Sequence, residues 1–289
     1  DLVPFKTCSY DCIYCQLGRT TEKTIERKEY VPAAEVMEEL KLKLSSPPEF
    51  DYISLAGSGE PTLNSKTGEI VRFAKGLTDV PVAVITNGSL LWMPEVAEEL
   101  MAADLVIPSL DAGDEKLFRH VNRPHPGISF DRMVDGIASF TSKFKGEVWL
   151  EVFLLGGITG IAPEVKKIAS LVERIAPARV QINTVARPAA EDYAFAITKE
   201  QVEEFCRLMP SGAEAIGVFE NAPFPGASGE VASEEAMLAL LSRRPCTVKD
   251  ISEGLGIAPQ EVVKVVDQLI AAKKIKAKRE TGGVYYIPA

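Results

Sequence analysis

Residues 8–15 read CSYDCIYC and place three of the five cysteines of the chain, Cys8, Cys12 and Cys15, at spacings of four and three. A zinc site would need a fourth Cys or His close by in a paired arrangement, but the two histidines of the chain lie over a hundred residues further on. Three thiolates on one short loop can instead hold three irons of a four-iron, four-sulfur cluster and leave the fourth iron free for a ligand. The stretch therefore predicts an iron–sulfur centre.

The composition of the chain predicts a globular protein of the cytoplasm. Of its 289 residues, 46% are hydrophobic and 25% are charged, and no apolar run approaches the roughly 18 residues of a membrane span. The first residues lack the features of a secretion signal, and the cysteines are not spaced as a disulfide framework. The formal charge of −9 argues against broad affinity for phosphate backbones. Because the chain begins at Asp1 without Met, we expect its natural N-terminus to be missing.

Short β-branched runs alternate with amphipathic helical patterns over the first 218 residues. The predicted strands are 2–6, 52–56, 80–86, 105–109, 148–155 and 180–185. The predicted helices are 33–44, 67–77, 95–101, 130–144, 163–175 and 199–208. Such alternation is typical of a parallel sheet with crossover helices, whose functional residues lie where strands end. The fold class we predict is α/β, a partial (β/α)6 TIM-like barrel.

The amino-acid composition and the pattern of predicted elements change after residue 218. A stretch rich in Pro, Gly and Ala, NAPFPGASG, is typical of a linker. Beyond it, helical patterns at 233–242, 247–255 and 259–271 precede a hairpin formed by 275–278 and 284–287. This order predicts a C-terminal winged-helix domain. The predicted division of the chain is a barrel at 1–220, a linker at 221–229 and a winged helix at 230–289.

The cysteine spacing resembles the signature of the radical S-adenosylmethionine (SAM) superfamily, with Tyr14 at the aromatic position before the last cysteine. Four further stretches at successive strand ends agree with this resemblance, which covers about residues 2–218. They are 57–62 (GSGEPT, a variant of the family's glycine- and glutamate-containing motif), 86–88 (TNG), 109–111 (SLD) and 156–160 (GGITG). A ligand with an ammonium, a carboxylate, ribose hydroxyls and a purine needs the acid, amides, polar pairs and apolar wall that these stretches contain.

The resemblance implies a role for each matching residue. Cys8, Cys12 and Cys15 would ligate the iron of a [4Fe-4S] cluster. Glu60 would hold the ammonium of SAM, while Asn87 and Ser109 would hold its polar ends. The remaining residues implied in cofactor binding are Tyr14, Gly59, Thr86, Asp111 and Ile158.

The resemblance also implies an activity. A one-electron reductant such as flavodoxin or ferredoxin would reduce the cluster, and SAM would be cleaved to methionine and a 5′-deoxyadenosyl radical that abstracts hydrogen from a substrate. Within the superfamily, the stretches around residues 4–18 and 59–62 look most like a group related to the enzymes of wybutosine synthesis, which modify a tRNA guanosine.

Two loops that the cofactor would leave free supply candidates for substrate contact. Residues 119–125 and 183–188 end at the same predicted mouth and contain side chains suited to anions or amides. Our candidates there are Arg123, His125, Asn183 and Arg187, for which pairing with surface acids or simple solvation is the alternative. Lys6 lies just before the cysteines, and the sequence is also compatible with an ordinary surface position for it.

Three classes of function fit the sequence. We favour a radical enzyme that acts on a small molecule or on a peptide or protein side chain; the alternatives are a radical tRNA-modifying enzyme and an iron–sulfur transcription regulator. On helix 259–271 we expect Val262, Val263, Val266, Leu269 and Ile270 in the core, which leaves outward a nearly neutral face made of Gln260, Glu261, Lys264, Asp267 and Gln268. A groove-reading helix is normally basic, so nucleic acid is disfavoured as a partner, although the basic stretch 273–279 keeps it as an alternative.

Overall fold

The computed structural model describes residues 1–45, 50–210, 212–216, 233–280 and 283–289, and its centre is a six-stranded sheet. All neighbouring strands are parallel and follow the chain order β3-β4-β5-β6-β7-β8. Their bounds are Ile53–Leu55, Val82–Thr86, Leu105–Pro108, Glu147–Leu154, Arg179–Thr184 and Glu214–Ala215. The α/β class with a parallel sheet is therefore confirmed, and the carboxyl ends of the strands lie along one edge.

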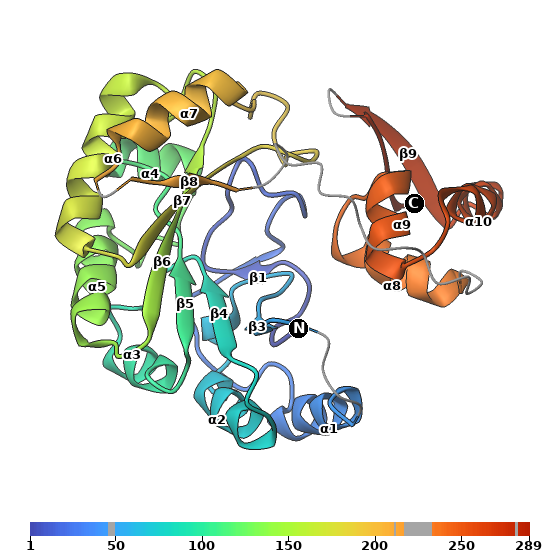
Figure 1. Cartoon of the computed structure of the whole chain (residues 1–289), viewed down its shortest axis with the longest axis horizontal. Helices are drawn as coiled ribbons and strands as arrows, with labels where there is room; N and C mark the ends of the chain where they lie inside the picture. The colour runs from blue at the N-terminus through green and yellow to red at the C-terminus, as the bar shows by residue number, and fades with distance from the viewer. Residues whose placement is uncertain (46–49, 211, 217–232, 281–282) are drawn as a thin grey trace.

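Helices connect the strands and pack on the outer face of the sheet, while the N-terminal segment lies on the other side (Figure 1). The helices are α1 Ala33–Lys43, η1 Pro61–Leu63, α2 Thr67–Leu77, α3 Pro94–Leu100, α4 Glu115–Val121, α5 Phe130–Lys143, α6 Ala162–Ile175 and α7 Lys199–Leu208. Sequence periodicity found all of them except η1 and α4, which are short. Among the described residues, no helix is long and apolar enough to cross a membrane.

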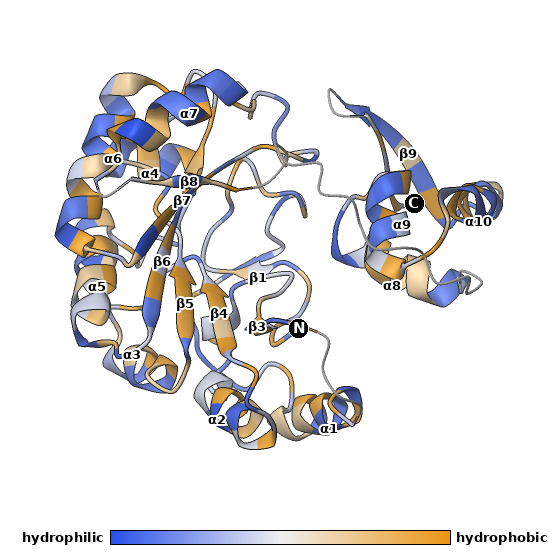
Figure 2. Ribbon diagram, viewed as in Figure 1, coloured by the Kyte–Doolittle hydropathy of each residue, from blue (hydrophilic) through white to orange (hydrophobic). Residues whose placement is uncertain are grey.

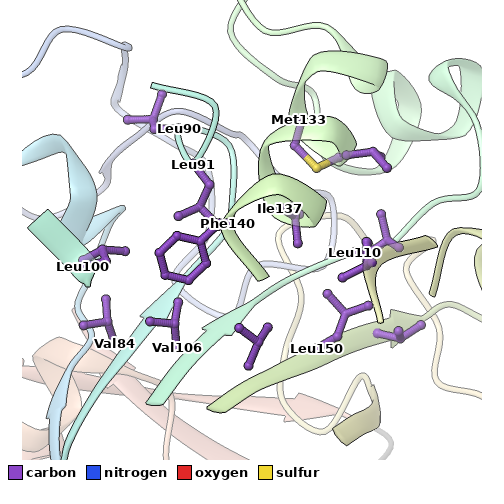
Figure 3. Close-up of a cluster of buried hydrophobic side chains, with 14 of the residues drawn as sticks. Val84, Leu90, Leu91, Leu100, Val106, Leu110, Met133, Ile137, Phe140 and Leu150 are labelled. Atoms are coloured by element: carbon purple, nitrogen blue, oxygen red, sulfur yellow. The ribbon is translucent and has the colours of Figure 1, made fainter. Parts of the chain in front are cut away.

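The core lies between the sheet and these helices. Helix α5 shows how the sequence builds it, because Met133, Ile137 and Phe140 recur at spacings of four and three and are all buried. Of the three, Phe140 lies beside the strand residues Val84 and Val106, as Figure 3 shows. Hydrophobic residues concentrate along the strands and hydrophilic ones on the outward helix faces (Figure 2). Burial of this apolar surface is the main source of stability for the unit that carries the site.

The first predicted strand, 2–6, is not a strand. Leu2 and Val3 are buried in the core, but Pro4 lacks a backbone N–H and Lys6 has a left-handed backbone, with φ of 60°. The extended segment is displaced to β1, Thr7–Cys8, which pairs in parallel with β2, Glu22–Lys23, outside the main sheet. The sixth strand of the sheet is instead β8, which is too short to show a pattern in the sequence.

The C-terminal unit contains three helices and an antiparallel hairpin, in the order that we predicted. They are α8 Glu234–Arg243, α9 Val248–Leu255, α10 Pro259–Ala271, β9 Ile275–Glu280 and β10 Gly283–Pro288. The predicted linker, 221–229, lies outside the described residues. In α10, Val262, Val266 and Leu269 are buried as expected, but Val263 and Ile270 are exposed. The buried stripe is therefore narrower than expected, because the unit is small and covers one side of the helix only.

Replacement of Phe140 by Ala should lower the free energy of unfolding by about 3 to 5 kcal/mol, since it leaves a cavity between α5 and the sheet. Denaturant unfolding followed by circular dichroism measures this. Phe195 is 62% exposed, so the matched change Phe195→Ala should cost about 0.5 kcal/mol or less. Equal losses for the two variants would show that this core is misassigned.

Candidate active site

The three clustered cysteines begin in β1 and continue along the loop that follows it. Each of their sulfurs accepts a hydrogen bond from a different side-chain nitrogen. The pairs are Cys8 with Asn87 Nδ2 at 3.6 Å, Cys12 with Asn122 Nδ2 at 3.5 Å, and Cys15 with Lys6 Nζ at 3.1 Å. N–H groups that donate to sulfur stabilise thiolates. Where the thiolates bind an iron–sulfur cluster, these hydrogen bonds also tune the reduction potential of the cluster. The arrangement thus suits three separate thiolate ligands.

Lys6 is a buried member of this site and not the surface residue that the sequence allowed. Only 3% of it is exposed, and its ammonium meets the sulfur of Cys15. Its left-handed backbone places its N–H 2.8 Å from the carbonyl oxygen of Ser58. A strained backbone that the surrounding structure holds in place is common at functional sites. The residue therefore joins the cysteine loop to the end of β3.

Glu60 holds the end of β4 against the cysteine loop. Its carboxylate is 2% exposed and accepts bonds from the Thr86 hydroxyl at 2.6 Å and the Asn87 N–H at 2.7 Å, and also from the N–H and hydroxyl of Thr62 at 3.0 and 2.6 Å. Burial raises the pKa of this carboxyl, and these hydrogen bonds oppose the rise. Because both oxygens are used within the protein, the first task of Glu60 is to position Asn87. Direct contact with an ammonium stays a prediction.

Asp111 plays the same part at the end of β5. Its Oδ2 accepts from the hydroxyl of Tyr14 at 2.5 Å and from Asn122 Nδ2 at 2.6 Å, and its Oδ1 accepts from the N–H of Phe153 at 3.2 Å. Burial raises its pKa to about 6, against the effect of the Tyr14 and Asn122 hydrogen bonds. The Tyr14 ring also stacks on Phe153, with centroids 4.0 Å apart. Asp111 therefore orients both Tyr14 and the amide that faces Cys12.

The donor set fits an iron–sulfur cluster better than a single metal ion. In the described part of the chain, no three His, Cys, Asp or Glu side chains converge as ligands for one ion. A cluster does not require such convergence, since each thiolate binds a different iron. Burial, with a further contribution from Glu60, raises the pKa of the Cys8 thiol to about 12, and burial with Asp111 raises that of Cys12. Binding of a cationic centre must therefore displace these protons.

A cavity of about 650 Å³ opens beside the cysteines, and two parts of the chain line it. Tyr14 and Cys15 belong to the cysteine loop, while Asp250 and Tyr285 come from the C-terminal unit. The other lining residues are Gln16, Leu17, Gly57, Glu151, Phe153, Asn183, Thr184, Val185, Ala186, Arg187, Thr247, Lys249 and Glu253. Its size is in the range of sites for cofactors and small ligands.

Two polar contacts join the C-terminal unit to the loop after β7, beside this cavity. The guanidinium of Arg187 meets Asp250 at 3.1 Å, and the hydroxyl of Tyr285 donates to the carbonyl oxygen of Ala186 at 2.9 Å. The Arg187 ion pair is among the causes that lower the pKa of Asp250 against the effect of its burial. The C-terminal unit therefore forms one wall of the cavity.

The four candidates for substrate contact divide into two pairs. Asn183 and Arg187 line the cavity. Arg123 and His125 are not among its lining residues. Arg123 instead binds Glu191 at 2.6 Å and the Tyr193 hydroxyl at 2.8 Å. His125 Nδ1 accepts a hydrogen bond from the N–H of Gly127 at 3.1 Å. Arg123 thus ties the loop after α4 to the segment beyond β7.

Two of the remaining predicted cofactor residues, Ser109 and Ile158, contact residues that line the cavity. Ser109 donates to Glu151 at 3.3 Å, and Ile158 packs in an apolar cluster with Tyr14 and Phe153. Sequence reasoning missed Glu151, which also accepts from Asn183 at 2.9 Å. A charged residue in the middle of an apolar strand was the signal that could have found it. Asn122 lay in a stretch that we singled out, but no spacing rule related it to Cys12.

The fold and the site together define the class of the protein: a parallel α/β sheet with a loop of three cysteines beside its strand ends. The sequence model of the radical SAM superfamily matches residues 2–172. The chain belongs to this superfamily. It is accordingly an enzyme that uses SAM and a [4Fe-4S] cluster.

Curated relatives extend over nearly the whole chain. The chain is 31% identical to the UPF0026 protein MJ1312 of Methanocaldococcus jannaschii, over 99% of its own length and 89% of that protein. It is 37% identical to a protein named GTPase Obg of Brachyspira hyodysenteriae, over 99% of its own length but only 42% of that longer protein. These names do not single out wybutosine synthesis.

Solved structures support the fold. A structure of TYW1 with a lysine-pyruvate adduct bound has a TM-score of 0.54 at 17% identity, over 70% of this chain and 68% of that one. Native anSMEcpe with bound AdoMet has a TM-score of 0.53 at 18% identity, over 70% and 56%. At these identities the likeness concerns the fold alone.

Replacement of Gly59 by Ala should impair cluster binding. A Cβ at this position would stand 1.9 Å from the carbonyl oxygen of Thr7 and 2.8 Å from Val3, so the backbone that leads into Cys8 must move. We expect the iron content after reconstitution to fall at least about twofold, since ligands must be held closely. Gly76→Ala is the matched control, because a Cβ there meets no atom within 4 Å. Full iron content in both variants would contradict the close approach.

Proposed function

We propose that this radical SAM enzyme abstracts hydrogen from a small molecule or from a peptide or protein side chain held in the cavity beside Cys15. The observation that carries the proposal is the shared lining of that cavity. Cys15 of the cysteine loop and Thr247, Asp250 and Tyr285 of the C-terminal unit face the same space. A substrate bound against the C-terminal unit would thus lie next to the reactive centre.

The proposed roles of the residues follow from the contacts. Cys8, Cys12 and Cys15 hold the cluster, and Asn87, Asn122 and Lys6 donate hydrogen bonds to their sulfurs. When bound, the cluster and SAM supply an electron and a 5′-deoxyadenosyl radical, with the electron from a reductant such as flavodoxin or ferredoxin. The SAM contacts that we propose are with Gly59, Glu60, Thr86, Asn87, Ser109, Asp111, Ile158 and Tyr14. Glu60 and Asp111 also position Asn87 and Asn122, the two asparagines that donate to cysteine sulfurs.

The proposed domains are a partial (β/α)6 barrel at 1–220, a linker at 221–229 and a winged helix at 230–289. The order of three helices and a hairpin in the C-terminal unit supports the last of these. Its own buried cluster, which includes Met237, Ile251, Val262 and Ile275, supports a separate core. Because α9 lines the cavity, we propose that this domain presents or covers the substrate.

One observation favours the tRNA-modifying alternative, including a relation to wybutosine synthesis. Lys276 and Arg279 on β9 are exposed next to Lys273 and Lys274, which makes the hairpin basic. Lys274, however, pairs with Glu234, and the outward face of α10 is close to neutral. The chain as a whole carries −9, which disfavours a phosphate backbone. We therefore rank this function second, while the superfamily favours an enzyme over a transcription regulator.

Anaerobic reconstitution should give about four irons and four sulfides per chain, and dithionite with SAM should then release 5′-deoxyadenosine. Cys12→Ala should abolish both, because it removes a ligand. Cys206→Ala is the matched control, since Cys206 lies on α7 and packs against the core. Iron and sulfide analysis with chromatography of the nucleoside measures these outcomes. Zinc without acid-labile sulfide would disprove the assignment of the cysteines.

Binding to tRNA at near-physiological salt should be weaker than about 1 µM, as expected of non-specific contacts. A gel-shift titration measures it, and Lys276→Gln with Arg279→Gln should remove what remains. A tight complex that depends on the tRNA sequence would instead establish the second function.

A further inference from the structure

A second chamber of about 350 Å³ adjoins the active-site cavity. Gln16 and Leu17, directly after the last cysteine, line both spaces. The chamber lies between the cysteine loop and the C-terminal unit, with Phe5, Pro188 and Ile287 among its walls. A ligand that occupies both spaces would extend from Cys15 past Leu17 and between the two parts of the chain.

The walls of this side chamber are mainly apolar. Phe5 is 53% exposed and lines the chamber together with other apolar side chains, so a bound ligand would cover it. Leu17 and Ile287 are half-buried and line the same space. Burial of these side chains by a ligand would provide the main part of its binding free energy.

The charged residues of the side chamber are all basic. Among the described residues that line it, Arg244 and Lys278 carry charge and no Asp or Glu is present. Lys278 is paired with Glu280 at 2.9 Å, whereas no hydrogen bond or ion pair joins the Arg244 guanidinium to another described residue. Because Lys278 already has a partner, the guanidinium of Arg244 is the group in this chamber that suits an anion.

We propose that the side chamber binds an apolar part of the substrate that ends in a carboxylate, with Arg244 as its partner. A guanidinium can bind both oxygens of a carboxylate through parallel N–H donors, and the apolar walls exclude a heavily hydrated group. The substrate is then elongated, with its reactive part beside Cys15 and its carboxylate near Arg244. Both a fatty acyl chain and the C-terminus of a peptide with a hydrophobic last residue have this chemistry. The inference rests on the proposed function for the position of the reactive part.

Equilibrium dialysis of the full-length, cluster-loaded protein tests the side chamber with two pairs of probes. Decanoate is compared with decan-1-ol, and N-acetyl-leucyl-leucine with its C-terminal amide. We expect the acid of at least one pair to bind about tenfold more tightly than its neutral partner, as a charge-assisted bond would give. The pair that shows the preference identifies the source of the carboxylate.

Substitutions in the chamber test whether the preference for the acid over its neutral partner arises there. Arg244→Gln should remove the tenfold preference and Arg244→Lys should keep part of it, whereas Arg243→Gln, at the exposed neighbouring position, should bind like the original protein. Ile287→Ser should weaken the acid and its neutral partner alike. Equal affinity for both members of each pair, or an equal loss from Arg243→Gln and Arg244→Gln, would overturn the inference. Dialysis needs neither SAM nor a reductant, so failure of the proposed radical chemistry would show separately as absent 5′-deoxyadenosine.

Discussion

Two buried carboxylates, those of Glu60 and Asp111, hold the cysteine loop against the ends of the parallel strands. Each accepts several hydrogen bonds from protein groups, and each orients an asparagine that donates to a cysteine sulfur. Burial of a carboxylate is costly unless its oxygens are bonded, so these networks are stable only in one arrangement. Contacts with the strand ends therefore fix the geometry of the cysteine loop, even though the loop contains little secondary structure of its own.

The same constraint explains why the sheet must be parallel at this edge. Glu60 follows β3, Asn87 follows β4 and Asp111 follows β5, and the carboxyl ends of parallel strands meet at one edge. Buried apolar contacts between the sheet and helices such as α5 keep these strands in register. The radical SAM activity thus depends on a core that takes no part in the chemistry.

The C-terminal unit adds a wall that the sheet cannot supply. Its contacts through Arg187 with Asp250 and through Tyr285 with Ala186 bring α9 and the hairpin beside the cavity at Cys15. The side chamber at Arg244 lies against the same junction. Under the proposed function, substrate choice can therefore change through residues of a small unit, while the cysteines proposed to bind the cluster stay as they are.

The sequence by itself determined the cluster, the strand–helix alternation and the order of elements in the C-terminal unit, because each depends on local spacing. Three cysteines within eight residues and apolar residues at three- or four-residue intervals carry their meaning without distant contacts. Only the tertiary structure decided that Lys6 is buried at Cys15, that Arg123 pairs with Glu191 and that Arg187 faces the cavity. The tertiary structure also showed that residues 2–6 are not a strand and that β8 is the sixth strand of the sheet. These outcomes depend on which segments meet across long stretches of chain, and the charge or polarity of a side chain does not specify its distant partner.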